Sequence, residues 1–137
     1  MTAVFDSLAA GMPVLVTHFL AAIAIFVVGV VIYNWLTPFH ELGLIREGNA
    51  AAGVSAAGAT IGLALPIAGA LAGSVNLFDL VVWGAVALVI QLLTFVIVAV
   101  VIRRLVEAIG RGEMASALLL AGVQISVGMI NAAAVRG

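Results

Sequence analysis

Four long runs of apolar residues, each almost free of charge, dominate this sequence of 137 residues. A helix needs about 20 apolar residues to cross the hydrocarbon core of a bilayer. The runs extend from about Met12 to Leu36, Asn49 to Gly73, Leu77 to Ile102 and Met114 to Val135. Only 8% of the residues are charged, against about 25% in soluble domains. The sequence therefore predicts an all-α membrane protein with four transmembrane helices in one domain, residues 1–137.

Local signals predict where these helices begin and end. Pro13 fits the first turn of the first helix, where a missing N–H costs little, and Pro38 favours its end. Asn49 is placed to cap the second helix, and Asn76 with Asp79 resembles a capping box for the third. Each predicted span is thus bounded by residues that suit a helix terminus.

Basic residues fall in two of the three connections and predict the orientation. Arg46 follows the first span, whereas Arg103, Arg104 and Arg111 follow the third, which we expect to continue as helix to Gly110. The connection between the second and third spans has no basic residue. Because an excess of Arg and Lys marks cytoplasmic loops, both termini are predicted to face outward.

The two halves of the chain resemble each other. Gly48 aligns with Gly112, 64 residues later, and the same offset aligns six further identical pairs in the second and fourth spans. These pairs are Ala51 with Ala115, Ala57 with Ala121, Gly58 with Gly122, Ile61 with Ile125, Ala68 with Ala132 and Ala70 with Ala134. The offset predicts two tandem hairpin repeats, at about 12–73 and 77–135, related by an axis along the membrane normal. Chance identity between Gly- and Ala-rich segments is the alternative.

Small residues recur every three or four positions along the second span and share one helix face. Gly58 and Gly62 form a GxxxG pair, which lets two helix backbones approach closely in a membrane. We predict a small-residue seam that packs the second span against the fourth, or against a neighbouring subunit. The alternative is a composition without packing consequence, and Pro66 is either a hinge or a tolerated kink. The predicted seam consists of Ser55, Gly58, Gly62, Pro66 and Gly69, with Gly122 and Ser126 as its counterparts in the fourth span.

Polar side chains within the spans are few, so each is a candidate for function. Gln124 and Asn131 are seven residues apart on one helix face, and with Gln91 and Thr94 of the third span they form a candidate polar path. The alternative is hydrogen bonding between helices, worth about 0.6 kcal/mol per pair on average. His18 is either a titrating group or a hydrogen-bonded packing residue.

Charged residues gather at the predicted cytoplasmic ends of the helices. Their mixed signs predict a solvated, partly salt-bridged rim, with a docking site for a cytoplasmic protein or for lipid headgroups as alternatives. We find no metal-ligand spacing and no nucleophile–base pair, so we expect no cofactor and no enzymatic activity. The net charge of −1 argues against a nucleic acid partner. The rim residues are Glu41, Arg46, Glu47, Arg103, Arg104, Glu107, Arg111 and Glu113.

Glu47-Gly48-Asn49 is followed by a run of Ala, and then by Gly58, Gly62, Trp83 and Gln91. In these residues the chain resembles the YjfL-like family of small bacterial inner-membrane proteins, whose function is unknown. The likeness extends roughly from Phe39 to Ala134, although the second hairpin opens with Gly112-Glu113 where the family often has Gly-Asn. The resemblance implies a four-helix protein of the bacterial plasma membrane and no known reaction.

Two hypotheses for function follow. The first is a non-enzymatic protein of the lipid bilayer that forms a helical homo-oligomer, with a structural or accessory role in the envelope. The second is a small ion or solute channel or transporter, with a path lined by the polar residues of the third and fourth spans.

Overall fold

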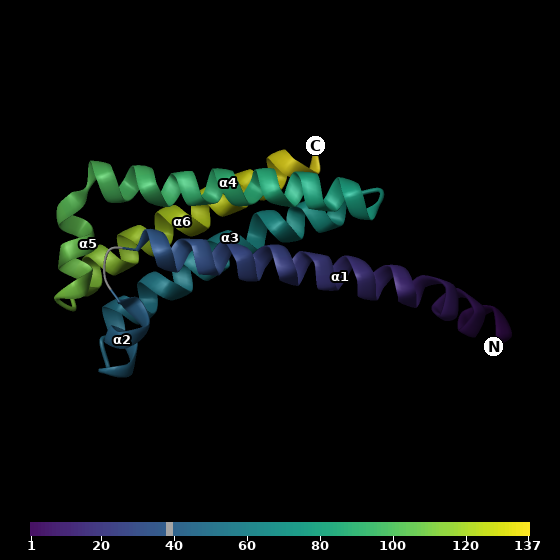
Figure 1. Cartoon of the computed structure of the whole chain (residues 1–137), viewed down its shortest axis with the longest axis horizontal. Helices are drawn as coiled ribbons and strands as arrows, with labels where there is room; N and C mark the ends of the chain where they lie inside the picture. Colours follow the sequence, from purple (N-terminus) through teal and green to yellow (C-terminus); the bar gives the residue numbers. More distant parts are fainter. Residues whose placement is uncertain (38–39) are drawn as a thin grey trace.

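The computed structural model describes residues 1–37 and 40–137, and within these residues all regular structure is helical. Four long helices run back and forth, and two short helices lie together at one end of the bundle (Figure 1). The helices are α1 (Thr2–Leu36), α2 (Glu41–Arg46), α3 (Ala50–Gly73), α4 (Leu77–Val101), α5 (Arg103–Gly110) and α6 (Met114–Arg136).

The prediction of an all-α protein with four membrane-spanning helices is confirmed. Each of α1, α3, α4 and α6 is long and apolar enough to cross a bilayer. The 24 residues of α3 extend about 36 Å, which exceeds a hydrocarbon core of about 30 Å. α3 packs more extensively against α6 than any other two helices pack together, which places the second and fourth spans side by side.

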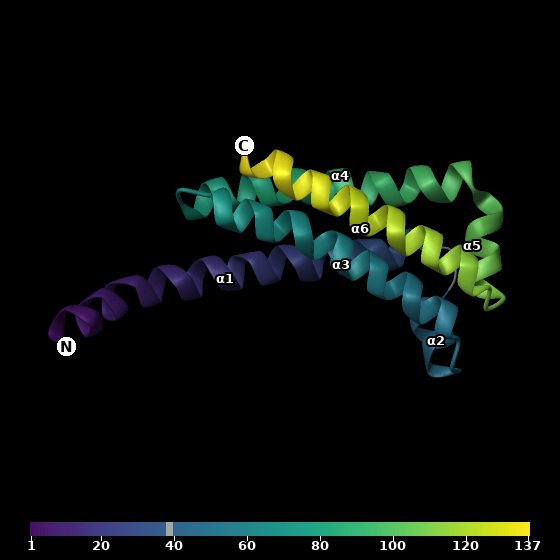
Figure 2. The same cartoon turned by 180° about the vertical axis from the view of Figure 1, so that it is seen from behind.

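The first helix is longer than predicted. α1 begins at Thr2 rather than near Met12, so Pro13 lies in the helix interior and not in its first turn. At 35 residues the helix is about 52 Å long, and its N-terminal part projects beyond the other helices (Figure 2). Every residue from 2 to 17 is exposed. Pro38, which we expected to stop this helix, lies outside the described residues.

Side-chain caps set the start of two helices, as the sequence predicts. Asn49 Oδ1 accepts a hydrogen bond from the Ala52 amide at 3.0 Å. Asn76 Oδ1 likewise accepts from the Asp79 amide at 2.9 Å, while the Asp79 carboxylate accepts from the Val75 amide at 3.1 Å. These bonds pair amide groups that a helix terminus otherwise leaves without partners.

The connections after the first and third spans differ from the prediction. α2 occupies the predicted loop after α1, and the predicted continuous third helix is instead broken at Ile102, where α5 turns away (Figure 1). α5 buries Leu105, Val106, Ala108 and Ile109 and exposes both of its Arg residues. A helix with opposite apolar and polar faces is suited to the membrane surface, so the turn lets the Arg side chains reach water.

Two turns have the same geometry at equivalent positions. Gly48 and Gly112 both adopt φ +87°, a conformation that glycine favours, and each lies between a short helix and a long one. The Asn49 amide donates to Leu44 O at 2.9 Å, and the Glu113 amide donates to Ala108 O at 2.9 Å. The donor residues of the two turns are thus 64 positions apart, and so are the acceptor residues.

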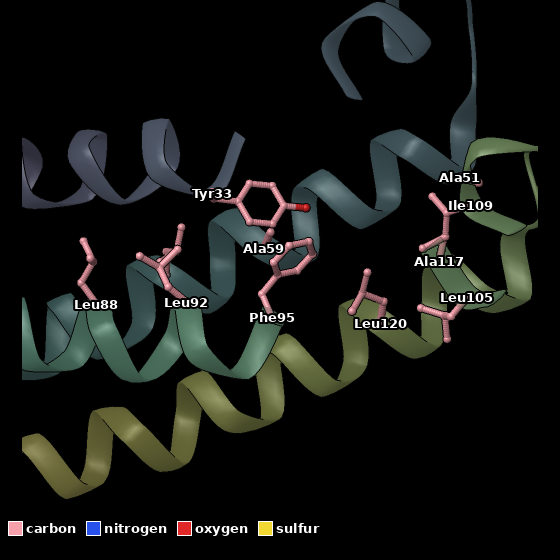
Figure 3. Close-up of a cluster of buried hydrophobic side chains, with 11 residues drawn as sticks. Tyr33, Ala51, Ala59, Leu88, Leu92, Phe95, Leu105, Ile109, Ala117 and Leu120 are labelled. Atoms are coloured by element: carbon pink, nitrogen blue, oxygen red, sulfur yellow. The ribbon is translucent and has the colours of Figure 1, made fainter. Parts of the chain in front are cut away.

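Larger apolar side chains pack where α1, α3 and α4 meet. Tyr33 lies edge-on against Phe95, with ring centroids 4.8 Å apart and planes at 69°. Leu88 and Leu92 of α4 lie in the same cluster, beside Ala59 of α3 (Figure 3). These side chains fix α1 and α4 against the inner pair of helices.

Candidate functional site

The α3–α6 contact is a close approach of two backbones. A Cβ atom at Gly58 would lie 2.4 Å from the Cα of Ala121, and one at Gly69 would lie 2.6 Å from the carbonyl oxygen of Ala132. Successive contacts advance in the same direction along both helices, so α3 and α6 run parallel. Close van der Waals contact of this kind is a main source of helix association in lipid.

Pro66 shapes the centre of this contact. Because Pro66 has no N–H, the carbonyl of Gly62 loses its usual partner within the helix. That carbonyl faces Gly128 of α6, where an added Cβ would lie 2.7 Å from the oxygen. A glycine at 128 thus lets the freed carbonyl pack against the facing backbone, as in a weak Cα–H···O contact.

Amide side chains form hydrogen bonds between α4 and α6 beside this contact. Gln91 Nε2 donates to the backbone oxygen of Gln124 at 2.7 Å and to its side-chain oxygen at 3.1 Å. Asn131 Nδ2 donates to the Ala87 carbonyl at 2.9 Å. All three amide side chains are buried. Their bonds join two antiparallel helices, which is how polar groups usually stabilise membrane bundles.

The candidate polar path is only partly assembled. The structure brings Gln91 and Gln124 together, whereas Asn131 bonds to the Ala87 backbone and Thr94 to the Ile90 carbonyl of its own helix at 2.9 Å. Thr94 is also partly exposed. The side-chain oxygens of Gln91 and Asn131 are buried and have no hydrogen-bond partner in the described part of the chain. The bonds of Gln91 and Asn131 lie between α4 and α6.

His18 lies on α1, and no hydrogen bond in the described part of the chain joins it to the amide side chains of α4 and α6. Its Nδ1 atom lies 2.8 Å from the Val14 carbonyl oxygen of its own helix. The side chain is partly exposed on α1, beyond the part of that helix that is packed into the bundle. The contact ties the imidazole to the backbone of α1.

The α3 and α6 members of the predicted small-residue seam differ in burial. The structure buries its five α3 members, Ser55, Gly58, Gly62, Pro66 and Gly69. The α6 members do not pack against α3, because Gly122 and Ser126 are exposed, and nothing lies within 4 Å of a Cβ built on Gly122. α6 instead presents Ala121, Gln124, Gly128 and Ala132 to α3. The α6 residues that pack against α3 are therefore not the residues that the 64-residue offset aligns with the α3 seam.

A second polar cluster lies where α1, α2 and α3 meet, and the sequence analysis missed it. Glu41 is wrongly predicted to belong to the solvated rim, since only 4% of its surface is exposed. Tyr33 donates a hydrogen bond from its hydroxyl to Glu41 Oε1 at 3.3 Å. Burial raises the pKa of Glu41, and the nearby hydroxyls of Tyr33 and Ser55 oppose that rise. Thr37 completes the cluster, and its hydroxyl donates to the Tyr33 carbonyl at 2.8 Å.

The other predicted rim residues are exposed, at the end of the bundle formed by α2 and α5 (Figure 2). Asn49 links the two turns there, because its Nδ2 donates to Gly110 O at 3.2 Å while its Oδ1 caps α3. The exposed rim residues are Arg46, Glu47, Arg103, Arg104, Glu107, Arg111 and Glu113.

Comparison with known proteins identifies the family of this chain. Residues 7–135 match the family model described as Domain of Unknown Function (DUF350). The chain is 32% identical over 116 residues to the UPF0719 inner membrane protein YjfL of Escherichia coli (strain K12). That alignment covers 85% of this chain and 88% of the relative. The chain belongs to this YjfL-like DUF350 family.

The same figures apply to the YjfL protein of Escherichia coli O157:H7, which is 32% identical over 116 residues. No solved structure matches the chain significantly. With four apolar helices and relatives named as inner membrane proteins, this DUF350 protein is a multi-pass protein of the inner membrane, as predicted. The resemblance inferred from the sequence is therefore confirmed, and the family is one of unknown function.

Proposed function

We propose that this DUF350 protein is a non-enzymatic membrane protein that forms a homo-oligomer and has a structural or accessory role in the envelope. The observation that carries the proposal is the outward face of α6. Gly122 and Ser126 lie one turn apart on that face, and both are exposed. Small residues at this spacing let a second helix approach closely in lipid.

The use of the buried amide groups supports a structural role. Gln91, Gln124 and Asn131 bond to one another or to a facing helix, which stabilises the bundle. The rim exposes charges of both signs, which suit contact with water or with a cytoplasmic protein partner. Exposed apolar side chains remain on α1, α4 and α6, and of these surfaces we assign the α6 face of Gly122 and Ser126 to the homo-oligomer contact.

Cysteine cross-linking in membranes tests the oligomer directly, because the natural chain contains no Cys. Gly122→Cys and Ser126→Cys are expected to form disulfide-linked dimers on mild oxidation. Val89→Cys, on an exposed position of α4, is the matched control and should remain a single chain. Equal cross-linking at all three positions, or none at any, would count against the proposed interface.

We also propose two tandem repeats, with both termini facing outward. The matched turns at Gly48 and Gly112 support the repeats, as does the parallel course of α3 and α6. The orientation is supported by Arg46 and by the Arg residues of α5, which lie at one end of the bundle (Figure 1). A reporter fused after Gly137 should read as periplasmic and one inserted after Gly112 as cytoplasmic, and the opposite pair of results would reverse the orientation.

The alternative function, a channel or transporter, has less support. Gln91, Gln124 and Asn131 are 1–4% exposed, and the backbones of α3 and α6 approach closely beside them. A liposome flux assay separates the two functions. Ion or solute leak that Asn131→Leu abolishes would favour the channel, whereas equal, low leak from both proteins fits the structural role.

A further inference from the structure

Glu41 is a buried carboxyl group at the end of the membrane bundle. It lies in the first turn of α2, with 4% of its surface exposed. Its one hydrogen bond in the described part of the chain comes from the Tyr33 hydroxyl at 3.3 Å. A buried carboxylate with a single neutral donor is costly, because burial removes the water that would otherwise stabilise the charge.

Among the described residues that surround Glu41, no positive charge offsets this cost. From α1 the facing titratable group is Tyr33, and α3 has no charged residue along its whole length. Next to it in the sequence and on α2 itself, His40 and Arg46 are exposed, as is Glu47 just beyond. No basic group is among the causes that shift the pKa of Glu41, which burial raises.

Ser55 supplies a second observation at this site. Its side chain is 1% exposed, and its Oγ atom makes no hydrogen bond in the described part of the chain. It lies close enough to Glu41 to influence the pKa of that carboxyl. Buried hydroxyl groups are normally paired, so an unpaired one beside an uncompensated carboxyl indicates a position that a small cation would fill.

We propose that Glu41, Ser55 and Tyr33 form a binding site for one monovalent cation, either a proton or a sodium ion. The site offers one negative charge and neutral hydroxyl oxygens, which are hard ligands. A single charge suits a monovalent ion, because divalent ions of this type are usually held by several carboxylates. A surface pocket lined by Asn34, Thr37, His40, Glu41 and Gly43, among others, gives access from the rim.

Thermal unfolding of the intact protein in lipid nanodiscs, between about pH 5 and pH 9, tests the site. The folded state binds the proton of Glu41 more tightly than the unfolded chain does, since the pKa is raised in the fold. The folded state therefore loses stability as the pH rises through that pKa. We expect the unfolding midpoint to fall by a few degrees as the pH rises in choline chloride.

Replacing choline with sodium separates the two cations. If sodium restores the midpoint at high pH in a dose-dependent way, the site takes sodium. If it does not, the site takes a proton alone. In both cases the unfolding midpoint of Glu41→Gln should change much less with pH and sodium than that of the parent protein. The midpoint of Glu47→Gln, which removes an exposed carboxyl, should change as it does in the parent protein. The proposal is overturned if Glu41→Gln responds as strongly as the parent.

Ser55→Ala provides a second test of the site if Glu41→Gln fails to fold. The Ser55 hydroxyl lowers the pKa of Glu41. Its loss should therefore move the fall in the unfolding midpoint to higher pH and weaken any increase in the midpoint that sodium causes. A serine that only fills space would leave the pH of the response unchanged, and that result would remove Ser55 from the site.

Discussion

Gly58→Ala should weaken the bundle although it adds only one methyl group. The new Cβ would lie 2.4 Å from both the Cα and the Cβ of Ala121, whereas ordinary contact begins at 3.4 Å. The two backbones must therefore separate by about 1 Å (3.4 − 2.4), and a gap of that size forfeits a quarter to a half of each contact energy along the seam. Overpacking of this kind typically costs about 1–3 kcal/mol.

Gly53→Ala is the matched control for this substitution. It lies in the same helix, and its added Cβ would meet nothing within 4 Å. Both changes gain roughly 1 kcal/mol of helix propensity, so that gain cancels in the comparison. The difference in unfolding free energy between the two variants should therefore be about 1–3 kcal/mol, with Gly58→Ala the less stable.

Reversible unfolding in mixed detergent micelles, followed by circular dichroism as the SDS fraction rises, measures this difference. The midpoint of Gly58→Ala should fall below that of Gly53→Ala. Equal midpoints would refute the reasoning, because they would mean that α3 and α6 do not approach closely at Gly58 in the folded protein.

Three further substitutions test other parts of the bundle by the same unfolding assay. Asn49→Ala removes the cap of α3 and the bond to Gly110, and should cost about 0.5–2 kcal/mol, whereas an unchanged midpoint would show that the cap contributes nothing. Gly112→Ala places a side chain at φ +87° and should cost at least about 1 kcal/mol, and a gain in stability would contradict that backbone conformation. Asn131→Leu removes the bond to the Ala87 carbonyl and should cost about 0.6–1.7 kcal/mol, so a loss above that range would indicate that Asn131 has further partners.

Much of the fold could be predicted because the sequence signals act locally. The apolar runs define the spans, Asn49 and Asn76 carry the side chains that cap them, and the spacing of small residues in α3 matches its buried face. The α6 face could not be predicted from the offset alone. Gly58 packs against Ala121 rather than its counterpart Gly122, so a shift of one residue turns the aligned glycine outward.

The burial of Glu41 depends on long-range packing. A carboxyl in a connection between spans is normally solvated, and no local pattern indicates that α2 folds back against α1 and α3. The break at Ile102 has a signal that the sequence analysis did not use. Apolar residues end there and Arg103-Arg104 follow, which favours a helix that turns into the membrane surface. Gln91 also meets Gln124 through packing of α4 on α6, which spacing along one helix cannot predict.

The mass of the intact assembly released from lipid nanodiscs tests the proposed function most directly. Native mass spectrometry of the parent protein should give a multiple of the 13.9 kDa chain. Gly122→Leu should shift the assembly toward the single chain while the helical circular dichroism signal is retained, because a branched side chain then blocks the exposed face of α6. A parent protein that leaves the lipid as a single chain would contradict the proposal that this DUF350 protein acts as a homo-oligomer.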